Sequence, residues 1–125
     1  MVEPDDVRRM AAAIEGALDV SDELRLGFEV AGAGKGFAWS FNERVHPKKP
    51  RVPRRDILAV RCPIERKEFL IEAAPDRFFD DDHYRGYPAV LVRLDVVEAE
   101  ELAGLLADAA RIVAAMKPRK SRKRG

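Results

Sequence analysis

The sequence predicts an α+β fold in which helices pack against an antiparallel sheet as a two-layer sandwich. Apolar residues recur at helical spacing near both ends of the chain, and they alternate with period two between residues 26 and 41. The expected strands are grouped between the helices, which favours this class over a parallel, doubly wound sheet. The length of 125 residues suits one domain, expected over residues 1–116, followed by a basic tail over residues 117–125.

The first expected element is an amphipathic helix that begins near Pro4 and ends between residues 19 and 21. Its apolar face carries Val7, Ile14 and Leu18. Residues 26–30 and 37–41 then alternate between apolar and polar, as strands with one apolar face do. The glycine-rich stretch between these two segments predicts the turn of a β-hairpin.

The middle of the chain predicts a loop, a strand and a helix. Residues 44–55 contain three prolines, which disfavour both helix and central strand, so this basic segment is expected to be an exposed loop. Residues 57–60 are continuously apolar, as in a central strand. Pro63 opens a helix that Pro75 stops, and its shared face is expected to include Phe69 and Leu70.

The last part of the chain predicts a strand and a long helix. Phe78 and Phe79 lead into an acidic turn, and residues 89–92 form an apolar strand. Asp95 and Glu98 have the spacing of a capping box, so the final helix is expected to start beyond Asp95 and run to Met116. The resulting order is helix, three strands, helix, one or two strands, helix.

The formal net charge of +1 conceals two basic segments attached to an acidic body. Six basic residues and no acid lie in the last nine positions, and six more, again without an acid, lie within residues 44–55. Such clusters can bind phosphates through counterion release, so we expect nonspecific nucleic-acid binding, with mere solvation of both segments as the alternative. The expected phosphate contacts are Arg44, Lys48, Lys49, Arg51, Arg54, Arg55, Lys117, Arg119, Lys120, Arg122, Lys123 and Arg124.

The run from Phe78 to Asp95 combines a His-Tyr pair, a Gly-Tyr-Pro triplet and an apolar strand that ends in Arg-Leu-Asp. Together with Glu101-Leu102 and the Ala-rich helix, it resembles the MmcQ/YjbR-like family of small bacterial proteins, over roughly residues 5–116. The resemblance implies an α-β(3)-α-β(2)-α sandwich with a frataxin-like or secretion-chaperone-like arrangement. It also implies DNA binding, although it defines no contact residues, and neither basic segment belongs to the family pattern.

A second hypothesis is a protein- or small-ligand-binding module that uses the sheet face or a cleft near Tyr84, Tyr87 and Arg93. The two tyrosines flank turn residues, which favours their exposure, and Arg93 is expected to point away from the apolar face of its strand. Trp39 belongs to a group of alternating aromatics that can form a binding platform but more often pack in a core. A partly apolar pocket beside these residues would support this hypothesis, whereas a flat surface would count against it.

No stretch of the chain carries a catalytic motif, so we expect a protein that is not an enzyme. Residues 31–36 are rich in glycine but lack the spacing and the following helix of a phosphate-binding loop. Residues 80–83, three Asp and one His, fit a solvated turn better than a cation site. Cys62 fits a buried thiol better than a nucleophile, and we expect neither a cofactor nor a metal.

The single cysteine is consistent with a reducing, cytoplasmic setting. The apolar stretches fall short of the roughly 20 residues needed to cross a bilayer. The first six residues are acidic where an export signal would be basic. We therefore expect a cytoplasmic protein with no membrane partner.

Overall fold

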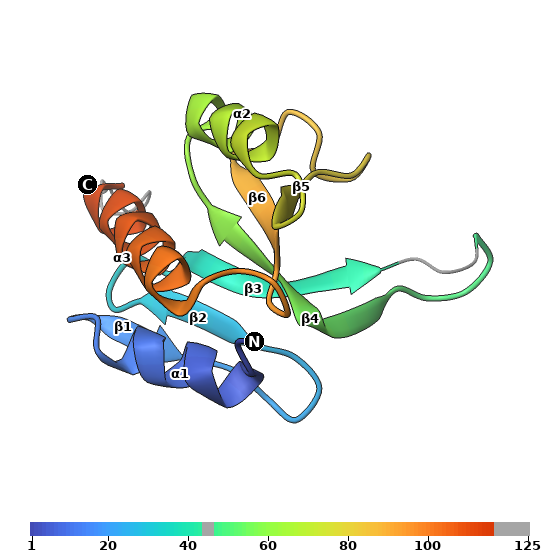
Figure 1. Cartoon of the computed structure of the whole chain (residues 1–125). Helices are drawn as coiled ribbons and strands as arrows, with labels where there is room; N and C mark the ends of the chain where they lie inside the picture. Colours follow the sequence, from blue (N-terminus) through green and yellow to red (C-terminus); the bar gives the residue numbers. More distant parts are fainter. Residues whose placement is uncertain (44–46, 117–125) are drawn as a thin grey trace, which may run out of the picture.

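The computed structural model describes residues 1–43 and 47–116, and within them three helices pack on one six-stranded antiparallel sheet (Figure 1). The helices are α1 (Pro4–Ala12), α2 (Ile64–Ala73) and α3 (Ala99–Ala115). The strands are β1 (Ala17–Asp19), β2 (Gly27–Val30), β3 (Gly36–Glu43), β4 (Val52–Arg61), β5 (Phe78–Phe79) and β6 (Ala89–Arg93). Their order across the sheet is β1-β2-β3-β4-β6-β5, which confirms the predicted α+β class.

The main core lies between the sheet and the helices α1 and α3. Helix α3 crosses β2, β3 and β4, and α1 packs beside it on β1 (Figure 1). A β-bulge between β2 and β3 turns both Phe37 and Ala38 into this core, where Phe37 packs on Phe28. Each fully buried Phe or Leu here stabilises the fold by about 1.5–3 kcal/mol.

A second, smaller core lies on the opposite face of the sheet. Side chains alternate along a strand, so Leu58 and Val60 of β4 join the main core while Ile57 and Ala59 join the second. The segment over residues 80–88, which links β5 to β6, covers this face with the ring of Tyr84. The second face of the sheet is therefore aromatic, and a loop closes it instead of a helix.

The first helix ends earlier than predicted, at Ala12 instead of residues 19–21. Gly16 adopts a φ of 84°, which reverses the chain and lets residues 17–19 pair with the edge of β2 as β1. Leu18 therefore lies in a strand and is 46% exposed. Four strands, not three, precede α2.

The basic segment is only partly the loop that was predicted, because β4 already begins at Val52 and includes Arg54 and Arg55. Pro53 is tolerated there because this half of β4 pairs on one side only: β3 runs along it, whereas β6 pairs with Ile57–Arg61. The β3–β4 hairpin consequently extends beyond the rest of the sheet (Figure 1).

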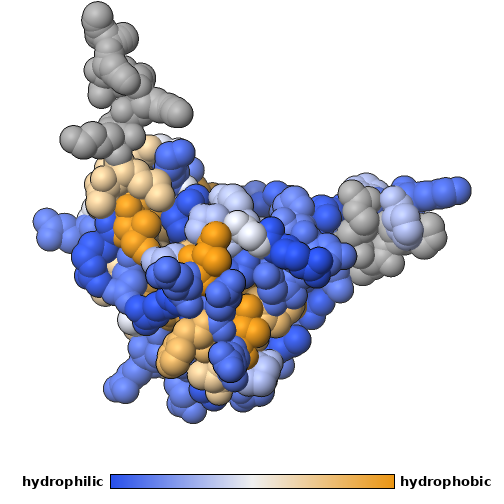
Figure 2. Space-filling view, turned by 90° about the horizontal axis from the view of Figure 1, so that it is seen from above, coloured by the Kyte–Doolittle hydropathy of each residue, from blue (hydrophilic) through white to orange (hydrophobic). Residues whose placement is uncertain are grey.

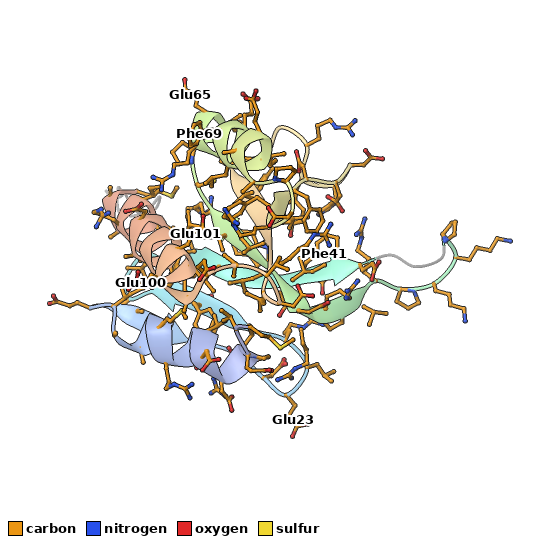
Figure 3. The ribbon with its side chains drawn as sticks, viewed as in Figure 1. Glu23, Phe41, Glu65, Phe69, Glu100 and Glu101 are labelled. Atoms are coloured by element: carbon orange, nitrogen blue, oxygen red, sulfur yellow. The ribbon has the colours of Figure 1, made fainter. Side chains whose placement is uncertain are left out.

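The faces of the last two helices also differ in detail from the prediction. In α2 the buried residues are Lys67 and Leu70, while Phe69 is 67% exposed. Apolar side chains therefore reach the surface on the α2 side of the molecule (Figure 2), and Phe69 lies on the outer side of α2 near Glu65 (Figure 3). The N-cap of α3 is Glu98, so Asp95 lies in the preceding turn and does not cap the helix. In the described part of the chain, no helix has the length and apolar character needed to span a membrane.

Candidate functional site

A pocket of about 260 Å³ lies on the aromatic face of the sheet, lined by Trp39, His83, Tyr84 and Tyr87. We call it the aromatic pocket. Trp39 comes from β3 and the other three from the segment over residues 80–88, so its wall joins residues more than 40 positions apart in the chain. Sequence reasoning proposed a cleft near the two tyrosines, and the structure has one there.

The rings of the aromatic pocket hold one another in place. The indole Nε1 of Trp39 donates a hydrogen bond of 2.8 Å to the hydroxyl of Tyr84. The ring of Tyr84 lies edge-on to those of His83 and Tyr87, with centroid distances of 5.1 and 5.9 Å. Burial raises the pKa of the Tyr84 hydroxyl, and the hydrogen bond from Trp39 offsets this only in part, so the group stays neutral.

Positive charge adjoins these rings. The guanidinium carbon of Arg61 lies 5.6 Å from the ring centroid of Trp39 and 5.9 Å from that of Tyr87. A hydrogen bond of 3.1 Å from its Nε to the carbonyl of Gly36 fixes this position. The charge of Arg51 also acts on the Tyr84 hydroxyl and favours its ionised form, against the negative charge of Asp81. One arginine, Arg61, therefore lies against two rings of the aromatic pocket.

The buried amine of Lys67 fixes the segment that carries three of these rings. Its Nζ donates hydrogen bonds to the carbonyls of Tyr84 (2.7 Å) and Tyr87 (2.9 Å), and it lies 3.1 Å from the Asp80 carboxylate. Three acceptors thus match the three donors of an ammonium group. Only 3% of the Lys67 side chain is exposed. The sequence analysis did not identify this residue.

The acidic turn within the same segment is a hydrogen-bonded turn, as predicted. Its carboxylates point to different partners: Asp80 to Lys67, Asp81 to the backbone N–H of Tyr84, and Asp82 to Arg85. Within residues 1–43 and 47–116, no three His, Cys, Asp or Glu side chains come together as a metal site would require. The glycine-rich residues 31–35 form the turn between β2 and β3, as predicted, and Gly36 is the first residue of β3.

Arg93 does not join the tyrosines that the second hypothesis grouped with it. It is exposed on β6, as expected, but its guanidinium lies 4.2 Å from the ring centroid of Phe79. In the sheet it pairs with Ile57, whereas Arg61, four residues along β4, pairs with the opposite end of β6. Tyr84 is also more buried than expected, at 8% exposure, while Tyr87 is 40% exposed.

The predicted phosphate contacts of the basic segment have different environments. Lys48 and Lys49 are exposed in the β3–β4 connection. Arg51 donates to the carbonyl of Asn42 and Arg55 to that of Glu23. Arg54 forms ion pairs of 2.7 Å with both Glu43 and Asp56, so its charge is already neutralised within the chain. The remaining predicted contacts, Arg44, Lys117, Arg119, Lys120, Arg122, Lys123 and Arg124, lie outside the described residues.

The two basic segments start from opposite ends of the molecule. The β3–β4 connection projects from one end of the sheet, and α3, which the tail follows in sequence, ends at the other (Figure 1). The described structure therefore does not place the attachment points of the two segments on one common surface.

Cys62 is buried, as predicted, at 5% exposure. Burial raises the pKa of its thiol to about 11, although the positive charges of Lys67 and Arg66 act in the opposite direction. The thiol is therefore protonated at neutral pH, which argues against a role as a nucleophile.

Replacing Lys67 by Met removes the amine and leaves the carbonyls of Tyr84 and Tyr87 without their buried donor. We expect the free energy of unfolding to fall by about 2–4 kcal/mol, measured by urea denaturation followed by circular dichroism. The control is Glu68→Met on the exposed side of α2, expected within about 0.5 kcal/mol of the parent. If Lys67→Met and Glu68→Met had equal free energies of unfolding, the Lys67 amine would not stabilise the segment over residues 80–88.

Alkylation of Cys62 by iodoacetamide at pH 8 should be about a hundredfold slower in the folded protein than in the urea-unfolded chain, because burial disfavours the thiolate. Between pH 8 and 10 the folded protein's rate should rise about tenfold per pH unit, as the pH stays below the raised pKa of about 11. Mass spectrometry at timed intervals measures both rates, and similar rates at pH 8 would contradict the assignment.

Comparison with known proteins agrees with this architecture. A family model described as YjbR matches residues 14–111. Uncharacterised proteins of Mycobacterium tuberculosis and Mycobacterium bovis are each 32% identical over 107 residues, which covers 84% of this chain and 83% of each relative. The crystal structure of protein DR2400 of Deinococcus radiodurans, with the domain DUF419, is similar with a TM-score of 0.67 and 26% identity, over 92% of this chain and 80% of that one. The chain therefore belongs to the YjbR family, as the motif around residue 80 indicated.

Proposed function

We propose that the protein is a binding module and that the aromatic pocket takes a planar aromatic anion, with a nucleotide as the ligand class to test first. The observation that carries this proposal is the convergence of Trp39, Tyr84 and Tyr87 with Arg61 at one pocket. Small-molecule sites typically combine apolar or aromatic walls with a few fixed polar groups, and this pocket has both.

The chemistry of the pocket selects both the shape and the charge of its ligand. A flat ring can lie against the half-exposed Trp39 and Tyr87, whose faces favour stacking. An anionic substituent is attracted by Arg61, whose guanidinium lies against the rings of Trp39 and Tyr87. At the Tyr84 hydroxyl, the negative charge of Asp81 acts more strongly than the positive charge of Arg51. The proposal assigns no chemical step to the pocket, and the absence of enzymatic activity stays a prediction from the sequence.

The only tryptophan of the chain is Trp39, so its fluorescence reports on the aromatic pocket directly. We expect AMP to quench this fluorescence saturably and adenosine to bind more weakly. Arg61→Gln should weaken AMP binding about three- to tenfold, because a cation beside the pocket is lost. Arg93→Gln is the matched control: it removes an arginine from the ring of Phe79 on the same sheet face and should leave AMP binding unchanged.

Two results would contradict the proposal for the pocket. One is the absence of saturable quenching by AMP at about 1 mM, a concentration at which even weak sites fill. The other is equal loss of affinity in Arg61→Gln and Arg93→Gln, which would place the anion elsewhere. Tyr87→Leu provides a further check, since it removes an exposed ring of the wall together with its contact to Arg61, and it should also weaken AMP binding.

The second candidate function is nonspecific nucleic-acid binding through the two basic segments, as the sequence indicates. The observation in its favour is that Lys48 and Lys49 are exposed on a hairpin that extends beyond the sheet (Figure 1). Phosphates of a nucleic acid can approach such a hairpin without meeting the acidic body. Arg54 is a weak contributor to this function because Glu43 and Asp56 already pair with it.

A salt titration of duplex DNA binding tests this second candidate. The double variant Lys48→Glu/Lys49→Glu should lower the slope of log affinity against log salt by about 2, and deletion of residues 117–125 should lower it further. Lys35→Glu, in the turn between β2 and β3, is the control and should change the slope little. Absence of binding at about 50 mM salt, or equal slopes for all variants, would exclude this function.

A further inference from the structure

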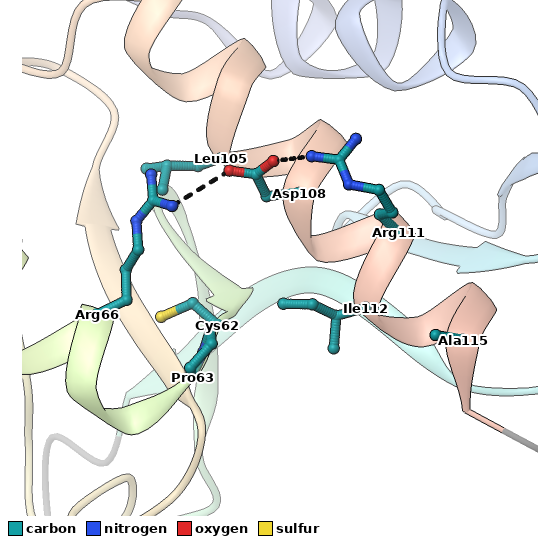
Figure 4. Close-up of a pocket in the computed structure, with 8 residues that line it drawn as sticks. All are labelled: Cys62, Pro63, Arg66, Leu105, Asp108, Arg111, Ile112 and Ala115. Atoms are coloured by element: carbon teal, nitrogen blue, oxygen red, sulfur yellow. Dashed lines mark hydrogen bonds and ion pairs between the residues drawn. The ribbon is translucent and has the colours of Figure 1, made fainter.

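A groove of about 400 Å³ separates α2 from α3, away from the aromatic pocket (Figure 4). Leu105, Ile112 and Ala115 of α3 form one wall, and Cys62 and Pro63, at the junction of β4 and α2, lie across from them. All five side chains are apolar or weakly polar. The groove therefore offers an apolar channel that runs along about 15 Å of α3, the length of helix between Leu105 and Ala115.

One edge of this groove carries an excess of positive charge. Asp108 pairs with both Arg66, at 3.3 Å, and Arg111, so two guanidinium groups share a single carboxylate (Figure 4). A carboxylate cannot satisfy the ten N–H donors of two guanidinium groups. The side chains of Arg66 and Arg111 are 50% and 72% exposed, so donors remain accessible to a ligand at the edge of the groove.

The lining residues that the structure describes along the groove carry no unpaired negative charge that would repel an anion. The Cys62 thiol is neutral at physiological pH because burial raises its pKa to about 11. Among the described residues that line the groove, Asp108 is the only acidic one, and both arginines already pair with it. An apolar channel beside two incompletely paired guanidinium groups is complementary to a molecule with an apolar chain and an anionic head.

We propose that this groove binds an amphiphilic carboxylate, such as a medium-chain fatty acid, with its chain along α3 and its carboxylate at Arg66 and Arg111. The volume of about 400 Å³ lies within the usual range for small-molecule sites. The chain's own residues 117–125 are unsuitable occupants, because six of them are basic and none is acidic. This inference is independent of the function proposed for the aromatic pocket.

Titration of the full chain with decanoate, below its micelle-forming concentration, tests the inference through ¹H–¹⁵N NMR spectra. Decanoate should shift the amides of residues 105–115 and of the first turn of α2 saturably. Decanol and decyltrimethylammonium, with the same chain and no negative charge, should bind at least about threefold more weakly. Octanoate should bind more weakly than decanoate, by up to about fourfold for each methylene group removed.

The variant Arg66→Gln/Arg111→Gln should abolish the preference for decanoate over decanol while its spectrum stays dispersed. The control is Arg9→Gln/Arg85→Gln, which removes two exposed arginines that each pair with an aspartate three residues away, as Arg111 does. Equal affinity for all three head groups, or shifts centred outside the groove, would overturn the inference. So would groove amides that shift with protein concentration alone, because a second copy of the chain would then occupy the groove.

Discussion

The burial of one ammonium group, that of Lys67, joins α2 to the segment over residues 80–88, which leads into β6. Its three donors meet two backbone carbonyls and one carboxylate, so each partner fixes the position of the others. The two carbonyls belong to Tyr84 and Tyr87, whose rings line the aromatic pocket. The stability of this end of the molecule and the shape of the site therefore depend on the same interaction.

The alternation of side chains along β4 gives the sheet two different faces. Leu58 and Val60 pack under the helices, whereas Ala59 and Arg61 lie on the opposite face, which the segment over residues 80–88 covers. Arg61 reaches Trp39 because its strand pairs with β3 in a register that aligns Trp39 with Ala59. A shift of one residue in this register would exchange the two faces of β4. The packing of Leu58 and Val60 in the main core fixes the register, and it thereby also places the charge of Arg61 beside the aromatic pocket.

The sequence was sufficient for the fold class, the β2–β3 hairpin, the long final helix and the family, because hydrophobic period and a local motif carry that information. It was not sufficient for the early end of α1, since Ile14 and Leu18 fit a helical face equally well until Gly16 reverses the chain. Hydrophobicity alone predicts that Phe69 lies on the buried face of α2. Lys67 is buried there instead, because the Tyr84 carbonyl, from a turn distant in the sequence, accepts its hydrogen bond. Arg61 was missed for the same reason: its aromatic partners are assembled only by tertiary structure.

The one-sided pairing of residues 52–56 has a consequence for how this protein can diverge. That half of β4 is exposed or half-buried, while residues 57–60 are buried and residues 58–60 are paired on both sides. Substitutions at the hairpin end change surface chemistry with little loss of core packing, whereas those in the central half alter both cores at once. The hairpin is thus the part of the sheet in which homologues can acquire new recognition properties at low cost in stability.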